Sequence, residues 1–290
     1  MFNGALTALV TPFRDGEVDA PALRDLIEWQ IQSGIDGLVP CGSTGESATL
    51  THAEHDNVIK LTIEQARKRV PVIAGTGSNS TAEAIRLTAA AREMGADGAL
   101  LLSPYYNKPT QDGIFRHYKT IAASVDLPLF VYNIPGRTAS NILPETMARL
   151  AEIKNIVGIK EASASMDQSS DILKMCGDRI TILSGDDALT VPLMALGAKG
   201  VISTCSNVVP REMHDLAAAA LTGDFAKARE IHYRLLPLIR SLFVETNPIC
   251  IKQAVASMGK CANELRMPLV QMTAAPAERL RIAMKELRLI

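Results

Sequence analysis

The chain has 290 residues and a formal net charge of −1, from 30 lysines and arginines against 31 aspartates and glutamates. That balance argues against a partner held by bulk charge, such as nucleic acid, and no apolar run reaches the roughly 18 residues of a membrane-spanning helix. Because the five cysteines form no C-x-x-C pair and the N-terminus lacks a signal-peptide pattern, we expect a cytoplasmic protein without disulfides or a cysteine zinc site.

Short runs rich in valine, isoleucine and leucine alternate along the chain with longer segments of helical period. Strands are predicted at residues 6–10, 37–40, 72–74, 99–102, 129–132, 157–160, 180–183 and 200–203. Helices are predicted at residues 21–33, 53–69, 82–94, 113–124, 144–150, 166–176, 187–196 and 211–222. Eight βα units in succession favour an α/β fold with a parallel (β/α)8 arrangement, a TIM barrel, over an open doubly wound sheet.

A weak glycine repeat supports the succession of βα units, and the loss of strand-like runs after Gly223 separates a C-terminal region from them. The tetrapeptides that begin at Gly34, Gly95 and Gly197 each lie between a predicted helix and strand, and their first glycine suits the left-handed conformation that ends a helix. After Gly223 the strand pattern disappears, and residues 224–240, 248–258 and 276–287 are predicted as helices. We therefore expect a barrel catalytic domain at residues 1–223 and a C-terminal helical domain at residues 224–290, packed against the barrel.

The strand at residues 157–160 ends in Lys160, at the end of the barrel where such enzymes place their active sites. A lysine that is desolvated there has a lowered pKa, and its neutral amine can form an imine with a carbonyl group. The simpler interpretation is a solvated lysine paired with Glu161.

The second strand leads into the sequence C-G-S-T-G-E-S at residues 41–47. Glycines on either side of Ser43 and Thr44 allow the backbone N–H groups to surround an anion such as a carboxylate. An ordinary flexible turn is the alternative. The segment is not a P-loop, since no G-K-[ST] follows.

Tyrosines and an arginine follow the fourth and fifth strands. Tyr132 ends the fifth strand one strand from Lys160, where its hydroxyl can relay protons. Arg137 can bind a substrate carboxylate through two hydrogen bonds, although an ordinary surface arginine is the favoured interpretation when this residue is taken alone. Tyr105 and Tyr106 lie on a proline-bounded loop that suits a subunit interface or a site.

Several further patterns have simpler explanations. His52 and His55 share one helix face, but the run H-A-E-H matches no metalloprotease motif, so we expect no metal site. Glu54 and Glu83 each match the capping box of a helix start. Two aspartates beside Gly185 argue against phosphate binding after the seventh strand.

Four motifs together resemble the pyruvate-dependent class I aldolase family, to which the N-acetylneuraminate lyases belong. They are G-S-T-G-E at residues 42–46, the tyrosine pair at 105–106, Y-N-I-P-G-R at residues 132–137 and G-I-K-E at residues 158–161. The resemblance covers almost the whole chain. Arg137 and residues 103–109 are similar to the synthase branch of the family, whereas the sialic-acid lyases lack the arginine. Ser43 departs from the threonine that many synthases carry.

The resemblance implies a class I aldolase that joins pyruvate to L-aspartate 4-semialdehyde, the first committed step of diaminopimelate and lysine biosynthesis. Lys160 would form the Schiff base with pyruvate, so no cofactor is needed. Tyr132 would pass protons through Thr44 to Tyr106, which reaches in from a neighbouring subunit. The substrate-binding residues implied by the family are Ser43, Thr44, Arg137, Gly185 and Ile202.

The resemblance also implies regulation and assembly. Members that are inhibited by L-lysine bind it between two subunits, and the family suggests a homotetramer, a dimer of dimers. The positions that match this lysine site are Ser47, Ala48, His52, His55, Asn79, Glu83 and Tyr105. Two alternatives remain open: the same chemistry on another acceptor, such as N-acetylmannosamine or a keto-deoxy sugar acid, and a non-catalytic lysine-binding barrel.

Overall fold

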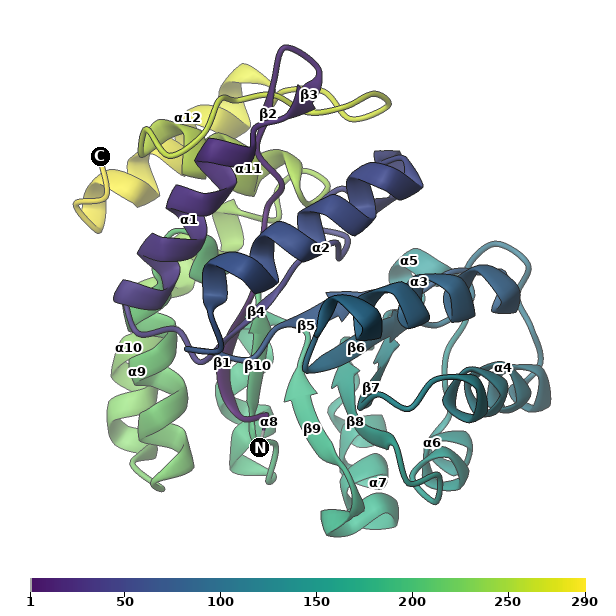
Figure 1. Ribbon diagram of the computed structural model, residues 1–290. Coiled ribbons are helices and arrows are strands. Elements are labelled where there is room, and N and C mark those ends of the chain that lie inside the picture. The colour runs from purple at the N-terminus through teal and green to yellow at the C-terminus, as the bar shows by residue number, and fades with distance from the viewer. Residues whose placement is uncertain (1) are drawn as a thin grey trace.

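Eight parallel strands stand at the centre of the computed structural model, which describes residues 2–290 (Figure 1). They are β1 (Gly4–Ala8), β4 (Gly37–Val39), β5 (Ile73–Gly75), β6 (Gly98–Leu102), β7 (Leu129–Asn133), β8 (Ile156–Glu161), β9 (Thr181–Ser184) and β10 (Gly200–Ser203). The strands pair in the order β4-β1-β10-β9-β8-β7-β6-β5, and a parallel bridge from Leu38 to Val72 joins the two ends. The predicted (β/α)8 TIM barrel is confirmed.

Helices follow the strands in sequence and surround them. They are α1 (Ala20–Gln32), α2 (His52–Ala66), α3 (Thr81–Met94), α4 (Gln111–Ser124), α6 (Pro144–Leu150), α7 (Met166–Cys176), α8 (Thr190–Ala195) and α9 (Pro210–Leu221). Every predicted strand and helix overlaps its observed element. The elements that the prediction missed are short: the hairpin of β2 (Phe13–Arg14) and β3 (Glu17–Val18), the helix α5 (Pro135–Thr138), and the 3₁₀ turns Ser47–Thr49, Gly177–Arg179 and Cys205–Asn207. The helix predicted at residues 187–196 begins with a 3₁₀ turn, Asp187–Leu189, and continues as α8.

Local sequence signals fix where the helices begin and end. Thr51 and Glu54 form a full capping box at the start of α2, because each side chain bonds the backbone N–H of the other. At the other end of a helix, Gly95 caps α3 with φ at 91°. The first glycines of the other two tetrapeptides also have positive φ, as expected.

Successive side chains of each strand point alternately into the barrel and toward the helices, and this divides the core into two layers. Inward-facing residues such as Leu6, Phe130 and Leu183 fill the barrel and are buried with Tyr132. Outward-facing residues such as Ile159 pack against the surrounding helices. Tyr132 and Lys160 are partners in the β7–β8 register, so both side chains face the interior at the same level.

Three helices follow the barrel: α10 (Phe225–Ser241), α11 (Ile249–Ser257) and α12 (Ala274–Glu286). α10 packs along α9, and α12 packs on both α10 and α11; these helices lie at the left and top of Figure 1. Within residues 2–290, no helix is long and apolar enough to cross a membrane.

Candidate active site

Lys160 lies near the carboxyl end of β8, at the wall of a cavity of about 210 Å³ in the barrel mouth. Its side chain is only 6% exposed, and Nζ is 4.3 Å from the centre of the Tyr132 ring. The ion pair with Glu161 that the sequence left open does not form. Glu161 instead accepts hydrogen bonds from the Ser163 N–H and the Asn133 side chain. The Lys160 amine is therefore aimed into the cavity and desolvated.

Burial lowers the pKa of Lys160 to about 8, from an ordinary value of 10.5. The carboxylate of Asp187 opposes this effect and raises the pKa, while the Arg137 guanidinium lowers it further. A substantial fraction of the amine is consequently neutral near physiological pH. A neutral, buried amine that lies over a tyrosine ring has the chemistry of an imine-forming nucleophile.

Asp187 follows β9 and was not singled out as a site residue from the sequence. It is 2% exposed, and one carboxylate oxygen accepts hydrogen bonds from the backbone N–H groups of Thr204 and Cys205 at 3.1 and 3.0 Å. Burial raises the pKa of Asp187, which these hydrogen bonds oppose. The group is thus a fixed acid whose charge acts on Lys160. The only local signal for it was the pair of aspartates after Gly185.

The turn at residues 42–46 lines the cavity with Gly42, Ser43 and Thr44. The Gly45 N–H bonds the Gly42 carbonyl at 3.0 Å, and the Glu46 N–H bonds the Ser43 carbonyl at 3.2 Å. Within residues 2–290, the N–H groups of Ser43 and Thr44 donate to no acceptor. Both residues line the cavity. This geometry suits a carboxylate that accepts from successive backbone donors.

Asn247, in the loop between α10 and α11, also lines the cavity and was missed from the sequence. Its Nδ2 donates to the Thr44 hydroxyl at 3.0 Å, and its carbonyl accepts from Arg137 at 2.7 Å. One residue of the C-terminal segment thereby links the turn to the arginine at the rim. No pattern near Asn247 indicates this role, because the contact with Thr44 spans 203 positions.

Two of the other predicted residues lie at the cavity wall or beneath it. Gly185 lines the cavity, and a Cβ there would be 3.1 Å from Lys160 Cε, so the absence of a side chain makes room for the lysine. Ile202 is buried in the inner layer of the barrel and does not line the cavity.

The predicted link from Tyr132 through Thr44 to Tyr106 is not formed within this single chain. Tyr106 is 88% exposed with φ at 71°, and it is not among the cavity residues. Within residues 2–290, the Thr44 hydroxyl bonds Asn247, and no hydrogen bond joins it to Tyr132. Any contribution of Tyr106 to this chemistry therefore requires another subunit.

The residues predicted to bind lysine lie in neighbouring segments outside the barrel mouth. His52 Nε2 is 2.9 Å from Glu83 Oε1, and Asn79 Nδ2 donates to the Tyr105 carbonyl at 3.2 Å. His55 is buried and bonds the Gly75 carbonyl at 2.9 Å. Ser47 and Ala48 directly follow the turn at residues 42–46, in a 3₁₀ turn.

The capping-box interpretation holds for Glu54 but only partly for Glu83. Ser80 caps the Glu83 N–H, yet the Glu83 carboxylate bonds Ser78 and His52 instead of returning to the Ser80 N–H. These bonds, led by the one from Ser78, lower the pKa of Glu83. Glu83 is therefore a fixed negative charge at the surface, available to a cation. Among residues 2–290, no group of three histidine, cysteine or acidic side chains is placed to hold a metal ion.

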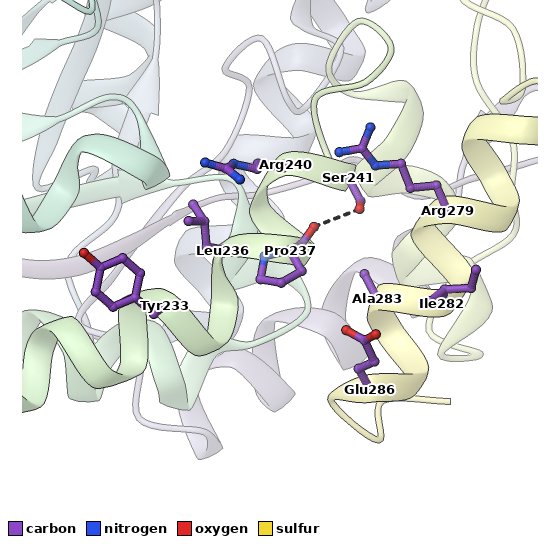
Figure 2. A pocket seen from close by; sticks show the side chains of 9 residues that line it. All are labelled: Tyr233, Leu236, Pro237, Arg240, Ser241, Arg279, Ile282, Ala283 and Glu286. Carbon is purple, nitrogen blue, oxygen red and sulfur yellow. Dashed lines mark hydrogen bonds between the residues drawn. The ribbon is translucent and has the colours of Figure 1, made fainter.

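A second hollow, of about 350 Å³, lies between α10 and α12 (Figure 2). It is larger than the cavity at the barrel mouth and shares no residue with it. Its lining includes the exposed side chains of Tyr233 and Ile282, and its one internal hydrogen bond joins the Ser241 hydroxyl to the Pro237 carbonyl. Size alone does not make it a site, and we place the chemistry at Lys160.

Comparisons with known proteins identify a family and structures that are similar over the whole chain. A model of the Dihydrodipicolinate synthetase family matches residues 1–287. The 4-hydroxy-tetrahydrodipicolinate synthase of Syntrophus aciditrophicus is 58% identical over the full length of both chains. A chloride-inhibited dihydrodipicolinate synthase from Acinetobacter baumannii, complexed with pyruvate, is 44% identical with a TM-score of 0.98, and covers both chains fully. The enzyme from Cyanidioschyzon merolae with lysine bound is 40% identical with a TM-score of 0.97, covering 100% of this chain and 99% of the other.

The environment of Lys160 predicts an unusual titration. At pH 8 about half of the Lys160 amine should be neutral, against about one in 300 for an ordinary lysine, because its pKa is lowered to about 8. The rate of reductive methylation at Lys160, followed by peptide mass spectrometry across pH 6–11, measures this, with the exposed Lys154 as an internal standard. Asp187→Asn should move the midpoint lower, since the carboxylate raises the pKa. A midpoint near 10.5 would contradict the desolvated amine.

Proposed function

The chain belongs to the Dihydrodipicolinate synthetase family and is an enzyme of that lyase family. On that premise we propose that it condenses pyruvate with L-aspartate 4-semialdehyde to give 4-hydroxy-tetrahydrodipicolinate, in the biosynthesis of diaminopimelate and lysine in the cytoplasm. The single observation that carries the proposal is the buried Lys160 amine, its pKa lowered to about 8, at the wall of a small cavity that also holds Tyr132.

The first half of the reaction uses Lys160 as a nucleophile. Neutral Nζ adds to the ketone carbon of pyruvate, and loss of one water from the carbinolamine gives the imine. The iminium nitrogen withdraws electrons, so the pyruvate methyl group loses a proton and an enamine forms. The N–H groups of Ser43 and Thr44 bind the pyruvate carboxylate during these steps, which their lack of other acceptors supports.

The second half makes the carbon–carbon bond. The enamine carbon attacks the aldehyde carbon of the semialdehyde. The aldehyde oxygen then takes up a proton and becomes the 4-hydroxyl group. Tyr132 delivers this proton, because burial raises the pKa of its hydroxyl and keeps it protonated. The substrate's own amine then adds to the imine carbon and expels Lys160, which closes the ring.

Arg137 is the binding group for the semialdehyde carboxylate. It is exposed at the rim of the cavity and its orientation is fixed by the bond to the Asn247 carbonyl. A guanidinium with one N–H group already engaged still has donors for a carboxylate. This arginine favours the semialdehyde over an uncharged sugar as the acceptor.

We propose that Tyr106 completes the proton relay of a neighbouring subunit in a homotetramer. The support is its placement: a tyrosine that is 88% exposed, on a loop with left-handed backbone at Tyr106 and Lys108, projects from the chain instead of packing against it. Exposed aromatic side chains of this kind commonly mark contacts with another chain.

L-lysine is the proposed inhibitor. The negative charge of Glu83 beside His52, together with the Asn79 amide and Tyr105, offers groups for both ends of an amino acid. The C. merolae enzyme with lysine bound supports this choice. Ser47 and Ala48 connect these residues directly to the carboxylate-binding turn, so a ligand here adjoins the pyruvate site through the chain itself.

The reaction can be tested with two pairs of substrates. Wild type should consume pyruvate with L-aspartate 4-semialdehyde but not with N-acetylmannosamine, and borohydride should trap a reduced pyruvate adduct at Lys160. Lys160→Ala should lose both the turnover and the trapping, since no other residue that lines the cavity in the described part of the chain carries a primary amine. Arg137→Ala should still be trapped with pyruvate while its kcat/KM for the semialdehyde falls about a hundredfold. Turnover with N-acetylmannosamine instead would support the imine mechanism but show that the acceptor is a sugar. Absence of a trapped adduct would favour the alternative of a non-catalytic lysine-binding barrel.

The lysine site predicts a dose-dependent loss of activity. Submillimolar to millimolar L-lysine should inhibit turnover, and Glu83→Gln should raise the inhibitory concentration about tenfold, because the ammonium loses a charge-assisted partner. Glu93→Gln, an exposed change on the same helix, is the matched control and should leave the curve in place. An inhibition curve that stays flat to millimolar lysine in wild type would contradict the proposal.

A further inference from the structure

A buried ion pair lies behind the carboxylate-binding turn, and the mechanism above does not use it. Lys252 of α11 and Glu46 at the end of the turn have fully buried side chains, with Nζ 2.8 Å from Oε1. Two charges that lose their hydration in this way add little net stability, because the attraction mostly repays the desolvation. The pair is therefore better explained by the local conformation that it specifies than by the stability that it adds.

The Lys252 ammonium is fixed in place by three oxygens. Besides Glu46, Nζ donates to the carbonyl of Thr11 at 2.6 Å and to the carbonyl of Glu264 at 3.0 Å. An ammonium has three protons, and here two of them are donated to backbone carbonyls while the charge is paired with Glu46. The Phe13 ring, whose centre is 4.5 Å from Nζ, covers the group on another side.

The Glu46 carboxylate is held by two segments of the C-terminal region. Oε1 is paired with Lys252 and receives no well-aligned hydrogen bond, so its only compensation is the charge of the lysine. Oε2 accepts from the backbone N–H of Arg266 at 3.1 Å. Arg266 is itself fixed by Glu54 at 2.5 Å and by the Gly16 carbonyl at 2.7 Å. Removing Lys252 would leave a buried carboxylate with one unsatisfied oxygen.

These contacts set the backbone of the turn. Glu46 has φ at 55°, a left-handed conformation that costs a residue with a side chain, and its N–H bonds the Ser43 carbonyl at 3.2 Å. Thr11, whose carbonyl accepts from Lys252, donates its own hydroxyl to the Gly45 carbonyl at 2.7 Å. Lys252 thus fixes two consecutive residues of the turn, Glu46 directly and Gly45 through Thr11.

We propose that Glu46, paired with Lys252, is a positioning residue that orients the N–H groups of Ser43 and Thr44 toward the pyruvate carboxylate. The proposal rests on the proposed function, since it assigns that carboxylate to the turn. Glu46 touches no substrate in this scheme. It acts through the Ser43 carbonyl and the left-handed backbone, which together fix the direction of the two donors.

The test uses the full-length protein and three variants: Glu46→Gln, Lys252→Met and the double variant. The pyruvate concentration that gives half-maximal borohydride trapping at Lys160 is measured for each, together with KM, kcat and the midpoint of thermal unfolding. In all three the half-maximal concentration and the KM for pyruvate should rise about tenfold or more, while trapping at saturating pyruvate still reaches completion. The double variant buries no unpaired charge and should fold even if the single variants do not.

Tyr118→Phe is the control for a purely structural effect. It removes a buried hydrogen bond to the Leu101 carbonyl on the helix side of the barrel, so it should lower the unfolding midpoint without changing the pyruvate dependence. The proposal is overturned if the folded double variant shows half-maximal trapping within about twofold of wild type, or if it fails to fold, since a positioning role predicts a folded chain with a displaced turn. Absence of trapping in wild type would contradict the proposed function instead.

Discussion

The proposed reaction depends on the desolvation of one amine. Lys160 can serve as the proposed nucleophile only while its ammonium form is disfavoured, and that requires a closed barrel with the side chain buried in its mouth. The two neighbouring strands make this burial possible. The Tyr132 ring, on β7, lies against Lys160 Nζ. Gly185, just after β9, leaves space for the lysine side chain, which a Cβ at that position would contact. The fixed charges of Asp187 and Arg137 act in opposite directions on the same group, so the amine stays near the range in which both of its forms are populated.

The barrel alone does not complete this site. Asn247 and Lys252, on either side of the start of α11, reach the carboxylate-binding turn from more than 200 positions away in the chain. One bonds the Thr44 hydroxyl, and the other pairs with Glu46. The C-terminal segment therefore contributes to the wall of the candidate site, and its first helix also packs on α9. A truncation after the eighth βα unit would remove both contacts together.

How far the sequence predicts the structure depends on the range of each interaction. The capping box of Thr51 and Glu54 and the helix end at Gly95 involve neighbours, and both were predicted. Lys160 and Tyr132 were predicted to share the barrel mouth because strand ends in a parallel barrel meet at one face. Asn247 carries no local signal, since its partners come from the other end of the chain. Glu83 lies between these cases: its backbone is capped locally, but the partners of its carboxylate, Ser78 and His52, depend on tertiary packing.

The two buried lysines at this end of the barrel show what separates a nucleophile from a structural cation. Burial lowers the pKa of both. Lys252 is surrounded by a carboxylate that pairs with its charge and by two carbonyls that accept hydrogen bonds from its ammonium group, and together they favour the charged form. The Lys160 amine lies over the Tyr132 ring, and within residues 2–290 it makes no hydrogen bond or ion pair. Its lone pair is consequently free to react once the proton leaves. The same residue type thus performs opposite tasks a few side chains apart, and the difference lies in the oxygens that surround each amine.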